Sequence, residues 1–427
     1  MRFLFTTFEG GGHVPPALLV ARQLQSHGHE VLFVSDEANR AQAVSARLRF
    51  EPWATAPNRT ALGGADDPLD DWRARWPPAV VRSVCQAVIT GPAARYASDT
   101  LDLVARFEPD AIVSNELLFG VMAAAEKVGV PLALLTANVW CFPTREDVPP
   151  FGPGFPPARN GFEAGRDRTS RRMIGRWYDA GLKDLNAARR GLGLPLLGAT
   201  LEQLMAAELV LLGASGAFDY GATPPPRPFA YAGPLGQAPD WAKASGDAGG
   251  LIDPSLPNVL VSFSTTYQGQ EPAVANAIRA LDGLPVNGIV TLGPALDPAK
   301  LPTAANVRVV ERADHDALIP HCRLMICHAG HGTVMRPLMH GVPVICIPTG
   351  RDQPENAQRI AWAGAGLRLP RRASVASIRR AVSRVLSDRG FAAKATVLGQ
   401  AIAEEADGGV RAAERLEALA AQRSLMN

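Results

Sequence analysis

Short apolar segments alternate with amphipathic segments along the first half of the chain. The apolar segments predict strands at Arg2–Phe8, Glu30–Ser35, Ala111–Ser114, Pro131–Thr136 and Ala207–Leu212. Apolar residues at helical spacing predict a helix over Pro15–His27, and a helical pattern returns over Arg171–Arg190. Strands and helices that alternate in this way are typical of βαβ units around a parallel sheet.

The same alternation starts again after a stretch rich in proline. Thr223–Pro228 reads TPPPRP and the polar segment Gly236–Asp253 follows it, so we predict a linker over residues 223–235. Further strands are predicted at Val259–Ser262, Gly288–Leu292, Val307–Val310, Leu324–Cys327 and Val344–Ile347. The chain thus predicts two α/β domains, residues 1–222 and 236–405. Ligands of such sheets bind beyond the carboxyl ends of the strands, so we expect the active site in the cleft between the domains.

Length and composition agree with two folded domains and exclude several classes of protein. A chain of 427 residues with 47% hydrophobic and 20% charged residues is typical of a globular protein rather than a disordered one. A net charge of +2 argues against nucleic acid as the main partner, because binding phosphates requires a concentrated basic face. The five cysteines show no metal-ligand spacing, and we predict neither a signal peptide nor a bilayer-spanning apolar segment from the sequence. We therefore expect a cytoplasmic protein without a membrane partner.

The most specific pattern is the segment HAGHGTVMRPLMHGVPVICIPTGRDQPENAQRI, which begins at His328. A histidine opens a glycine-rich turn, a predicted helix and a buried strand follow, and Asp352 and Gln353 come next. Glycines let backbone N–H groups approach a diphosphate, and the helix N-terminus behind them carries partial positive charge. An acid–amide pair one strand later can bond sugar hydroxyls. This order predicts a site for a nucleotide sugar.

A second histidine follows the first predicted strand. His13 comes after Gly10-Gly11-Gly12 and directly before a predicted helix, where the helix dipole disfavours the protonated imidazole. A neutral histidine that faces the cleft can take the proton of an acceptor hydroxyl while that oxygen attacks the anomeric carbon of the sugar. The alternative is a histidine that only caps the helix.

Together these segments resemble the GT-B glycosyltransferases, in particular those of the bacterial macrolide and antibiotic type. The resemblance extends to TTFEGGGHVPPALLVARQLQSHGHEV at the start, to EPDAIVSNELLFGVMAAAEKVGVPLALLT and to VLVSFSTTYQ. It implies an α/β fold of the GT-B class, with two Rossmann-like parallel-sheet domains that face a central cleft. It also implies that a C-terminal helix, within residues 406–427, packs back on the first domain.

The resemblance implies that His13 is the general base, since Gly12-His13-Val14-Pro15-Pro16 matches the family's pattern around that residue. The family's supporting aspartate is replaced here by Asn115, and Glu116 is next. Asn115 could accept a hydrogen bond from the imidazole, but it offers no charge to stabilise an imidazolium. Either Asn115 or Glu116 is expected to support His13, unless the acceptor is acidic enough to need little help.

The resemblance also implies which residues bind the donor. The diphosphate turn would consist of His328, Gly330, Gly332 and Thr333, and the phosphates would also face Ser264 and Thr265. The hydroxyls of the sugar would be held by Asp352 and Gln353, with Thr136 near the sugar. The nucleobase would lie near His315. Arg336 is a departure, because many relatives have a glutamate there that accepts hydrogen bonds from both ribose hydroxyls. Arginine can only donate, which favours a TDP-sugar over a UDP-sugar.

No metal or other cofactor is expected besides the nucleotide-sugar co-substrate. Asp314-His315-Asp316 spells a D-x-D sequence, which binds a metal in another glycosyltransferase fold. A helix start with acidic residues in its first turn is the simpler interpretation here. In the GT-B fold the helix dipole and the N–H groups of the turn would stabilise the charge of the leaving diphosphate.

These features predict an inverting glycosyltransferase that moves a hexose from a TDP- or UDP-sugar to a small, largely apolar natural product, such as a polyketide or aromatic aglycone. Trp140, Phe142, Phe151 and Trp177 could line the acceptor pocket or belong to the core. We expect a monomer or homodimer whose partners are these two small molecules. The alternatives are a nucleotide-sugar 2-epimerase and a non-catalytic partner of the same fold, the latter suggested by Asn115 and Arg336.

Overall fold

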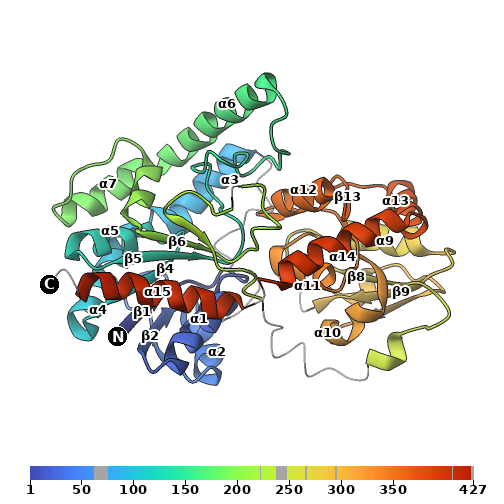
Figure 1. Cartoon of the computed structure of the whole chain (residues 1–427), viewed down its shortest axis with the longest axis horizontal. Helices are drawn as coiled ribbons and strands as arrows, with labels where there is room; N and C mark the ends of the chain where they lie inside the picture. The colour runs from blue at the N-terminus through green and yellow to red at the C-terminus, as the bar shows by residue number, and fades with distance from the viewer. Residues whose placement is uncertain are drawn as a thin grey trace.

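The computed structural model describes residues 1–61, 76–221, 223–236, 248–264, 267–293, 296–405 and 407–424. Two α/β domains lie side by side, each built around its own parallel sheet (Figure 1). This arrangement confirms the predicted GT-B class of fold. None of the helices in these ranges is both long and apolar enough to cross a bilayer.

The first domain contains a seven-stranded sheet in the order β3-β2-β1-β4-β5-β6-β7. Its strands are β1 (Arg2–Thr6), β2 (Glu30–Ser35), β3 (Arg49–Pro52), β4 (Ala111–Asn115), β5 (Leu132–Thr136), β6 (Leu209–Leu212) and β7 (Phe229–Tyr231). Its helices are α1 (Val14–Ser26), α2 (Arg40–Ser45), α3 (Pro77–Val84), α4 (Ala93–Phe107), α5 (Phe119–Val128), α6 (Gly161–Tyr178) and α7 (Leu182–Gly191). The direction of strand order changes between β1 and β4, and at such a point the loops diverge and leave a crevice.

The second domain contains a six-stranded sheet in the order β10-β9-β8-β11-β12-β13. Its strands are β8 (Asn258–Ser262), β9 (Asn287–Thr291), β10 (Val307–Val310), β11 (Cys322–Cys327), β12 (Val344–Cys346) and β13 (Gly366–Arg368). Its helices are α9 (Glu271–Leu281), α10 (His315–Leu318), α11 (His331–Met339), α12 (Gln353–Ala363), α13 (Val375–Ser387) and α14 (Arg389–Ala403). Here the strand order changes direction between β8 and β11, so both domains have a crevice at the carboxyl ends of their central strands.

Buried residues alternate between the two faces of each sheet, as the pleat of a strand requires. In β1, Leu4 packs in the core on one face with Ile112, whereas Phe3 and Phe5 pack on the other face. Both faces are covered, which explains why these strands are apolar along their whole length.

The chain returns to the first domain at its end. Helix α15 (Gly408–Ser424) lies against α1 (Figure 1). Its residues Leu416 and Leu419 share one apolar core with Leu24 of α1 and Phe3 of β1. The helix thus ties the second half of the chain to the first domain through buried apolar surface.

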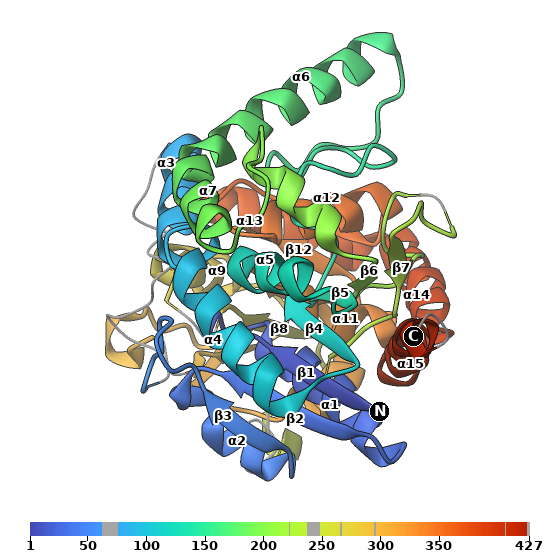
Figure 2. The same cartoon turned by 90° about the vertical axis from the view of Figure 1, so that its left-hand side faces the viewer.

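Several elements differ from the prediction. Strand β7 lies inside the predicted linker of residues 223–235 and pairs with β6, so the first sheet extends to Tyr231. Strands β3 and β13 were not predicted, because they read RFEP and GLR and have no run of apolar residues, unlike the equally short β6, β10 and β12. The helical segment predicted over Arg171–Arg190 is divided between α6 and α7 by a short 3-10 turn at Asp179–Gly181. Helix α6 extends away from the body of the first domain (Figure 2).

Candidate active site

A cavity of about 870 Å³ lies between the carboxyl ends of the two sheets. From the first domain it is lined by His13, Glu116, Asn138, Phe151 and Trp177, among others. The second domain contributes Ser264, His315, His328, Gly330, Gly332, Thr333, Arg336, Asp352 and Gln353. Most of the predicted donor residues therefore share one space with the predicted base, and the volume is in the range of small-molecule sites.

His13 lies at the N-terminus of α1, where the chain leaves β1 and crosses the crevice beside β4. Its side chain is 19% exposed, and its Nδ1 atom lies 3.1 Å from Nδ2 of Asn115 and 3.8 Å from Oε1 of Glu116. Burial, helped by the positive charge of Arg351, lowers the pKa of His13 to about 4. The imidazole is therefore neutral near pH 7, as a general base must be.

Asn115 has the opposite hydrogen-bonding role to the one predicted, because it donates and does not accept. Its Oδ1 atom accepts a hydrogen bond from the backbone N–H of Leu117 at 2.9 Å, which turns the amide nitrogen towards His13. Asn115 therefore donates to Nδ1 of the imidazole and does not accept from it. The sequence could not show this, because the orientation depends on how the backbone turns after β4.

Glu116 is the carboxylate beside the histidine, and it is 1% exposed. Its Oε1 atom accepts a hydrogen bond from the Cys141 thiol at 3.6 Å. Burial raises the pKa of Glu116 to about 7. Its charge therefore changes near neutral pH within a few ångströms of His13.

The glycine-rich turn follows β11, directly before α11. Gly330 is the N-cap of this helix, and a Cβ atom there would lie 2.5 Å from Nε2 of His328, so the turn needs glycine at this position. Gly332 and Thr333 lie in the first turn of the helix and line the cavity. The N–H of Thr333 donates to the carbonyl oxygen of Gly330 at 3.0 Å, whereas the N–H of Gly332 is among the groups at a helix start that can bind an anion.

Two histidines flank this turn, and both are neutral. Burial, together with the charge of Arg351, lowers the pKa of His328 to about 4. His331, which was not predicted as a site residue, has its pKa lowered to about 4 mainly by burial. Its Nε2 atom lies 3.1 Å from the carbonyl oxygen of Gly213 in the first domain, so this side chain connects the two domains.

The acid–amide pair lies between β12 and α12 and is already hydrogen-bonded within the protein. Oδ2 of Asp352 accepts from Nδ2 of Asn138 at 3.1 Å and from Asn356 at 2.7 Å. Gln353 is 2% exposed, and its amide nitrogen donates to Gln268 at 2.6 Å. Asn138 and Gln268 were missed in the sequence, although Asn138 follows β5 closely and so lies at the edge where ligands bind.

His315, which was predicted to lie near the nucleobase, lines the cavity together with Arg336. Nε2 of His315 lies 3.0 Å from the hydroxyl of Thr291, and Nε of Arg336 lies 4.0 Å from Asp316. Asp314 accepts hydrogen bonds from the N–H groups of Asp316 and Ala317, so the D-x-D sequence forms the start of α10, as the simpler interpretation predicts.

Two predicted donor residues are not found in the cavity wall, namely Thr136 and Thr265. Thr136 is fully buried, and its hydroxyl donates to the side-chain oxygen of Asn138 at 3.2 Å. It therefore lies behind Asn138 instead of beside the sugar. Ser264 lines the cavity, whereas Thr265 lies outside the described residues.

The predicted acceptor aromatics separate into two groups. Phe151 and Trp177 line the cavity. Trp140 and Phe142 are 5% and 2% exposed and pack on each other in the core, with ring centroids 5.3 Å apart, so their prediction as acceptor residues is wrong. The apolar wall of the cavity comes instead from Val80, Val81 and Val84 of α3 and from Met173 and Ile174 of α6.

Known proteins resemble the chain over nearly its whole length. A family model for the C-terminal domain of erythromycin biosynthesis protein CIII-like proteins matches residues 277–419. The chain is 31% identical over 408 residues to the 4'-demethylrebeccamycin synthase of Lentzea aerocolonigenes, which covers 91% of this chain and 93% of that protein. It is 27% identical over 456 residues to the aklavinone 7-beta-L-rhodosaminyltransferase of Streptomyces galilaeus, with 99% and 96% covered.

Among solved structures, the glycosyltransferase of kitacinnamycin has the same fold. It matches with a TM-score of 0.73 at 20% identity, over 98% of both chains. The two facing sheets, the cavity between them and these relatives lead to one conclusion. The chain belongs to the nucleotide-sugar-dependent GT-B glycosyltransferases of antibiotic biosynthesis, enzymes that transfer a sugar to a natural-product aglycone.

Proposed function

We propose that this enzyme transfers a hexose with inversion from a nucleotide sugar to a hydroxyl of a small, largely apolar aglycone. One observation supports the proposal more than any other. The neutral imidazole of His13 and the glycine-rich turn at Gly330 line the same cavity from opposite domains. An acceptor oxygen deprotonated on one side could therefore attack a sugar whose diphosphate is held on the other side.

In this mechanism Nε2 of His13 takes the proton of the acceptor hydroxyl, so the neutral ring must carry its hydrogen on Nδ1 when it reacts. Oε1 of Glu116 lies 3.8 Å from Nδ1 and can accept that hydrogen, whereas the contact with Asn115 favours the other tautomer and has to be given up. The acceptor oxygen forms its bond to the anomeric carbon as the bond to the diphosphate breaks. Backbone N–H groups in the first turn of α11 stabilise the charge on the leaving group. His328, Ser264 and Thr333 also line the cavity, and we assign all three to the binding of the diphosphate.

Glu116 is the better candidate for the group that supports His13. Its carboxylate is close enough to stabilise an imidazolium, whereas Asn115 presents an N–H group to the ring. An N–H donor favours a lone pair on Nδ1 and so opposes protonation at that atom. We propose that Asn115 holds the ring only in the resting enzyme, and that Glu116 accepts the hydrogen on Nδ1 and stabilises the positive charge that forms during the reaction.

The donor is proposed to be a TDP-sugar in preference to a UDP-sugar. Arg336 lines the cavity near His315, at the end assigned to the nucleoside, and it cannot accept hydrogen bonds from two ribose hydroxyls. Asp352, held by Asn138 and Asn356, offers a carboxylate to the hydroxyls of the sugar. No metal is required in this scheme.

The acceptor is proposed to be a polyketide or aromatic aglycone. The wall formed by α3 and α6 is apolar and includes the ring of Trp177, which suits such a molecule.

The direct test is a screen of TDP- and UDP-sugars against a panel of polyphenol and polyketide aglycones, with products identified by mass spectrometry and anomeric configuration by NMR. An inverted glycoside is expected, and a retained configuration would contradict the mechanism. Incubation with UDP-GlcNAc and no acceptor tests the alternative, since an epimerised sugar would identify a 2-epimerase. Absence of any turnover or nucleotide binding would favour the non-catalytic partner.

A further inference from the structure

We propose that Glu355 is a positioning residue for the acceptor, because from the donor-binding domain it fixes the loop that forms part of the acceptor wall. The inference rests on the proposed function in assigning that wall to the acceptor. Glu355 is on α12, three residues after Asp352 and two after Gln353. It is 1% exposed, and neither its role nor its partners follow from the sequence pattern.

The contact between Glu355 and the loop is made through the loop's backbone. Oε1 of Glu355 accepts hydrogen bonds from the N–H of Gly152 at 2.9 Å and from the N–H of Gly154 at 2.7 Å. Hydrogen bonds to an ionised acceptor are stronger than neutral ones. One carboxylate oxygen of the second domain thus fixes two amides of the first domain.

The same loop is also held at its carbonyl groups. Arg368 of β13 donates to the carbonyl oxygen of Gly154 at 2.7 Å. Gly154 has a φ of +63°, and a Cβ atom there would lie 2.6 Å from the carbonyl oxygen of Pro354. Only glycine allows the loop to lie this close to the first turn of α12.

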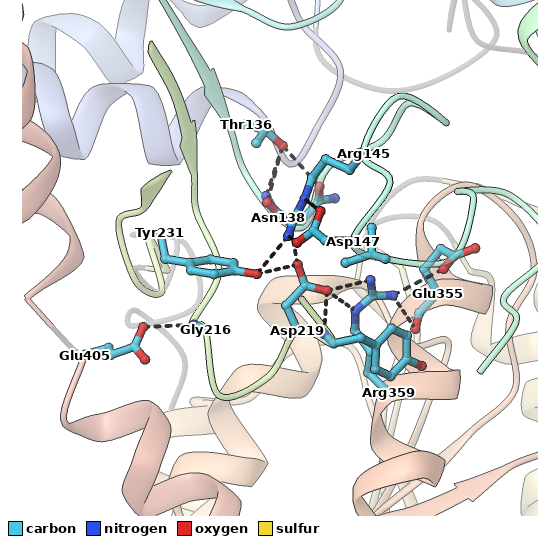
Figure 3. A network of polar contacts seen from close by, with 12 residues as sticks. Thr136, Asn138, Arg145, Asp147, Gly216, Asp219, Tyr231, Glu355, Arg359 and Glu405 are labelled. Carbon is cyan, nitrogen blue, oxygen red and sulfur yellow. Dashed lines mark hydrogen bonds and ion pairs between the residues drawn. The ribbon is translucent and has the colours of Figure 1, made fainter. Parts of the chain in front are cut away.

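The second oxygen of Glu355 begins a chain of buried charges that crosses between the domains (Figure 3). Arg359 lies 3.2 Å from Oε2 of Glu355 and 2.7 Å from Asp219, and Asp219 lies 2.9 Å from Arg145. Asp219 has its pKa lowered to about 2 by Arg359 and Arg145 in spite of burial. Buried charges that lose their partners are unfavourable, so each member of the chain keeps its neighbour in one position.

Arg145 connects this chain to the start of the loop. Its guanidinium binds Asp147, and its carbonyl oxygen accepts a hydrogen bond from Arg171 of α6 at 2.6 Å. Arg171 also donates to the carbonyl oxygen of Val148 at 2.7 Å. The loop is therefore fixed near residues 145–148 by the ion pairs and α6, and near residues 152–154 by Glu355 and Arg368.

The segment between these anchors faces the cavity. Phe151, Gly152 and Pro153 line it, and a Cβ atom at Gly152 would lie 3.9 Å from Cδ1 of Ile174 in α6, while Asp352 and Gln353 line the cavity at the start of α12. One helix start therefore touches both the donor site and the acceptor wall. The position of the second domain decides the shape of the acceptor pocket, so loss of the Glu355 contacts should weaken acceptor binding more than donor binding.

Hydrogen–deuterium exchange tests the anchor without the need for turnover. In the wild-type enzyme, peptides that contain the amides of Gly152 and Gly154 should exchange slowly. In Glu355→Ala these amides should exchange about tenfold faster or more, and in Glu355→Gln the increase should be smaller, because the amide oxygen of glutamine still accepts hydrogen bonds. Glu271→Ala is the matched control, since Glu271 is also in the first turn of a helix of the second domain but bonds Tyr267 and not the loop.

Kinetics then separate positioning from a general structural role. For the aglycone that the panel identifies, KM should rise about tenfold in Glu355→Ala, whereas the Kd of thymidine diphosphate measured by calorimetry should stay within about twofold. Circular dichroism and thermal unfolding show whether Glu355→Ala folds. If it does not, the exchange, KM and Kd measurements are made on Glu355→Gln and Arg368→Met instead.

Three results would overturn the inference. They are fast exchange of the loop amides in the wild-type enzyme, unchanged exchange in the folded variants, and an equal loss of nucleotide and acceptor binding. If no aglycone is turned over, the proposed function fails, but the exchange measurement still decides whether Glu355 anchors the loop.

Discussion

The two domains contain the same local structure, a glycine-containing turn between a central parallel strand and a helix, yet the two turns differ in what they can bind. In the second domain α11 begins His331-Gly332-Thr333, so every residue of its first turn has an N–H group. In the first domain α1 begins Val14-Pro15-Pro16, and two of those N–H groups are absent. The first turn of α1 is therefore poorly suited to an anion, while the first turn of α11 keeps N–H groups, such as that of Gly332, that fit the proposed diphosphate site.

The comparison also concerns charge. His13 and His328 each follow the central strand of their own sheet, and burial together with Arg351 lowers the pKa of each to about 4. Glu116 lies 3.8 Å from His13, whereas no carboxylate among the described residues pairs with His328. Two neutral histidines in similar turns therefore differ in how well they can act as a base. The one with an acidic neighbour can take up a proton during the reaction.

The largest expected effect comes from removing the imidazole of the first turn. His13→Ala should lower turnover by a factor of about a hundred or more, since a general base contributes that much. The Kd of thymidine diphosphate should change little, because the imidazole lies in the domain opposite the diphosphate turn. Steady-state kinetics and calorimetry measure the two quantities. His27→Ala, at the other end of α1, is the control, and unchanged turnover in His13→Ala would remove the proposed base.

The next effect concerns the N–H groups of the second turn. Gly332→Pro should weaken thymidine diphosphate binding about tenfold, because it removes a donor at the second position of α11 as Pro15 does in α1. Gly332→Ala is the matched control and should bind as the wild type does, since no atom lies within 4 Å of a Cβ at this position. Equal affinity in the proline variant would show that this N–H does not contact the diphosphate.

A smaller effect, dependent on pH, is expected from the acidic neighbour. Burial raises the pKa of Glu116 to about 7, so its carboxylate is charged above that pH and protonated below it. Glu116→Gln should therefore lower kcat about tenfold at pH 8, where the charge that stabilises the imidazolium is lost, and much less at pH 6. The ratio of wild-type to variant kcat, measured across this range, should rise with pH. A ratio that stays constant would mean that Glu116 does not act through its charge.

Local patterns in the sequence were sufficient to predict where both turns lie. Glycines at Gly10–Gly12 and Gly330–Gly332, each between an apolar strand and a helix start, predict the places where the structure has them. The strands of five or six residues were also predictable, whereas β3, β7 and β13 were not. These three strands read RFEP, FAY and GLR and have no run of aliphatic residues, whereas the equally short β6, β10 and β12 have one and were predicted.

Side-chain roles within the cavity depended on the tertiary structure. Phe142 and Phe151 are separated by only a few residues, yet one packs in the core and the other lines the cavity. Asn115 was predicted to accept a hydrogen bond and instead donates, because the backbone N–H of Leu117 occupies its oxygen. Neither outcome is encoded in residue type, since an aromatic ring or an amide suits both environments.

The alternation of apolar and amphipathic segments by itself determined two parallel-sheet domains, and the order of glycines and histidines determined where the two turns lie. These features depend on backbone geometry within a few residues, which the local sequence specifies. Only the tertiary structure decided which groups meet across the cleft, such as Asn138 with Asp352 and Glu355 with Gly152. Those pairs form because two separately folded surfaces come together, and no pattern in either segment names its partner.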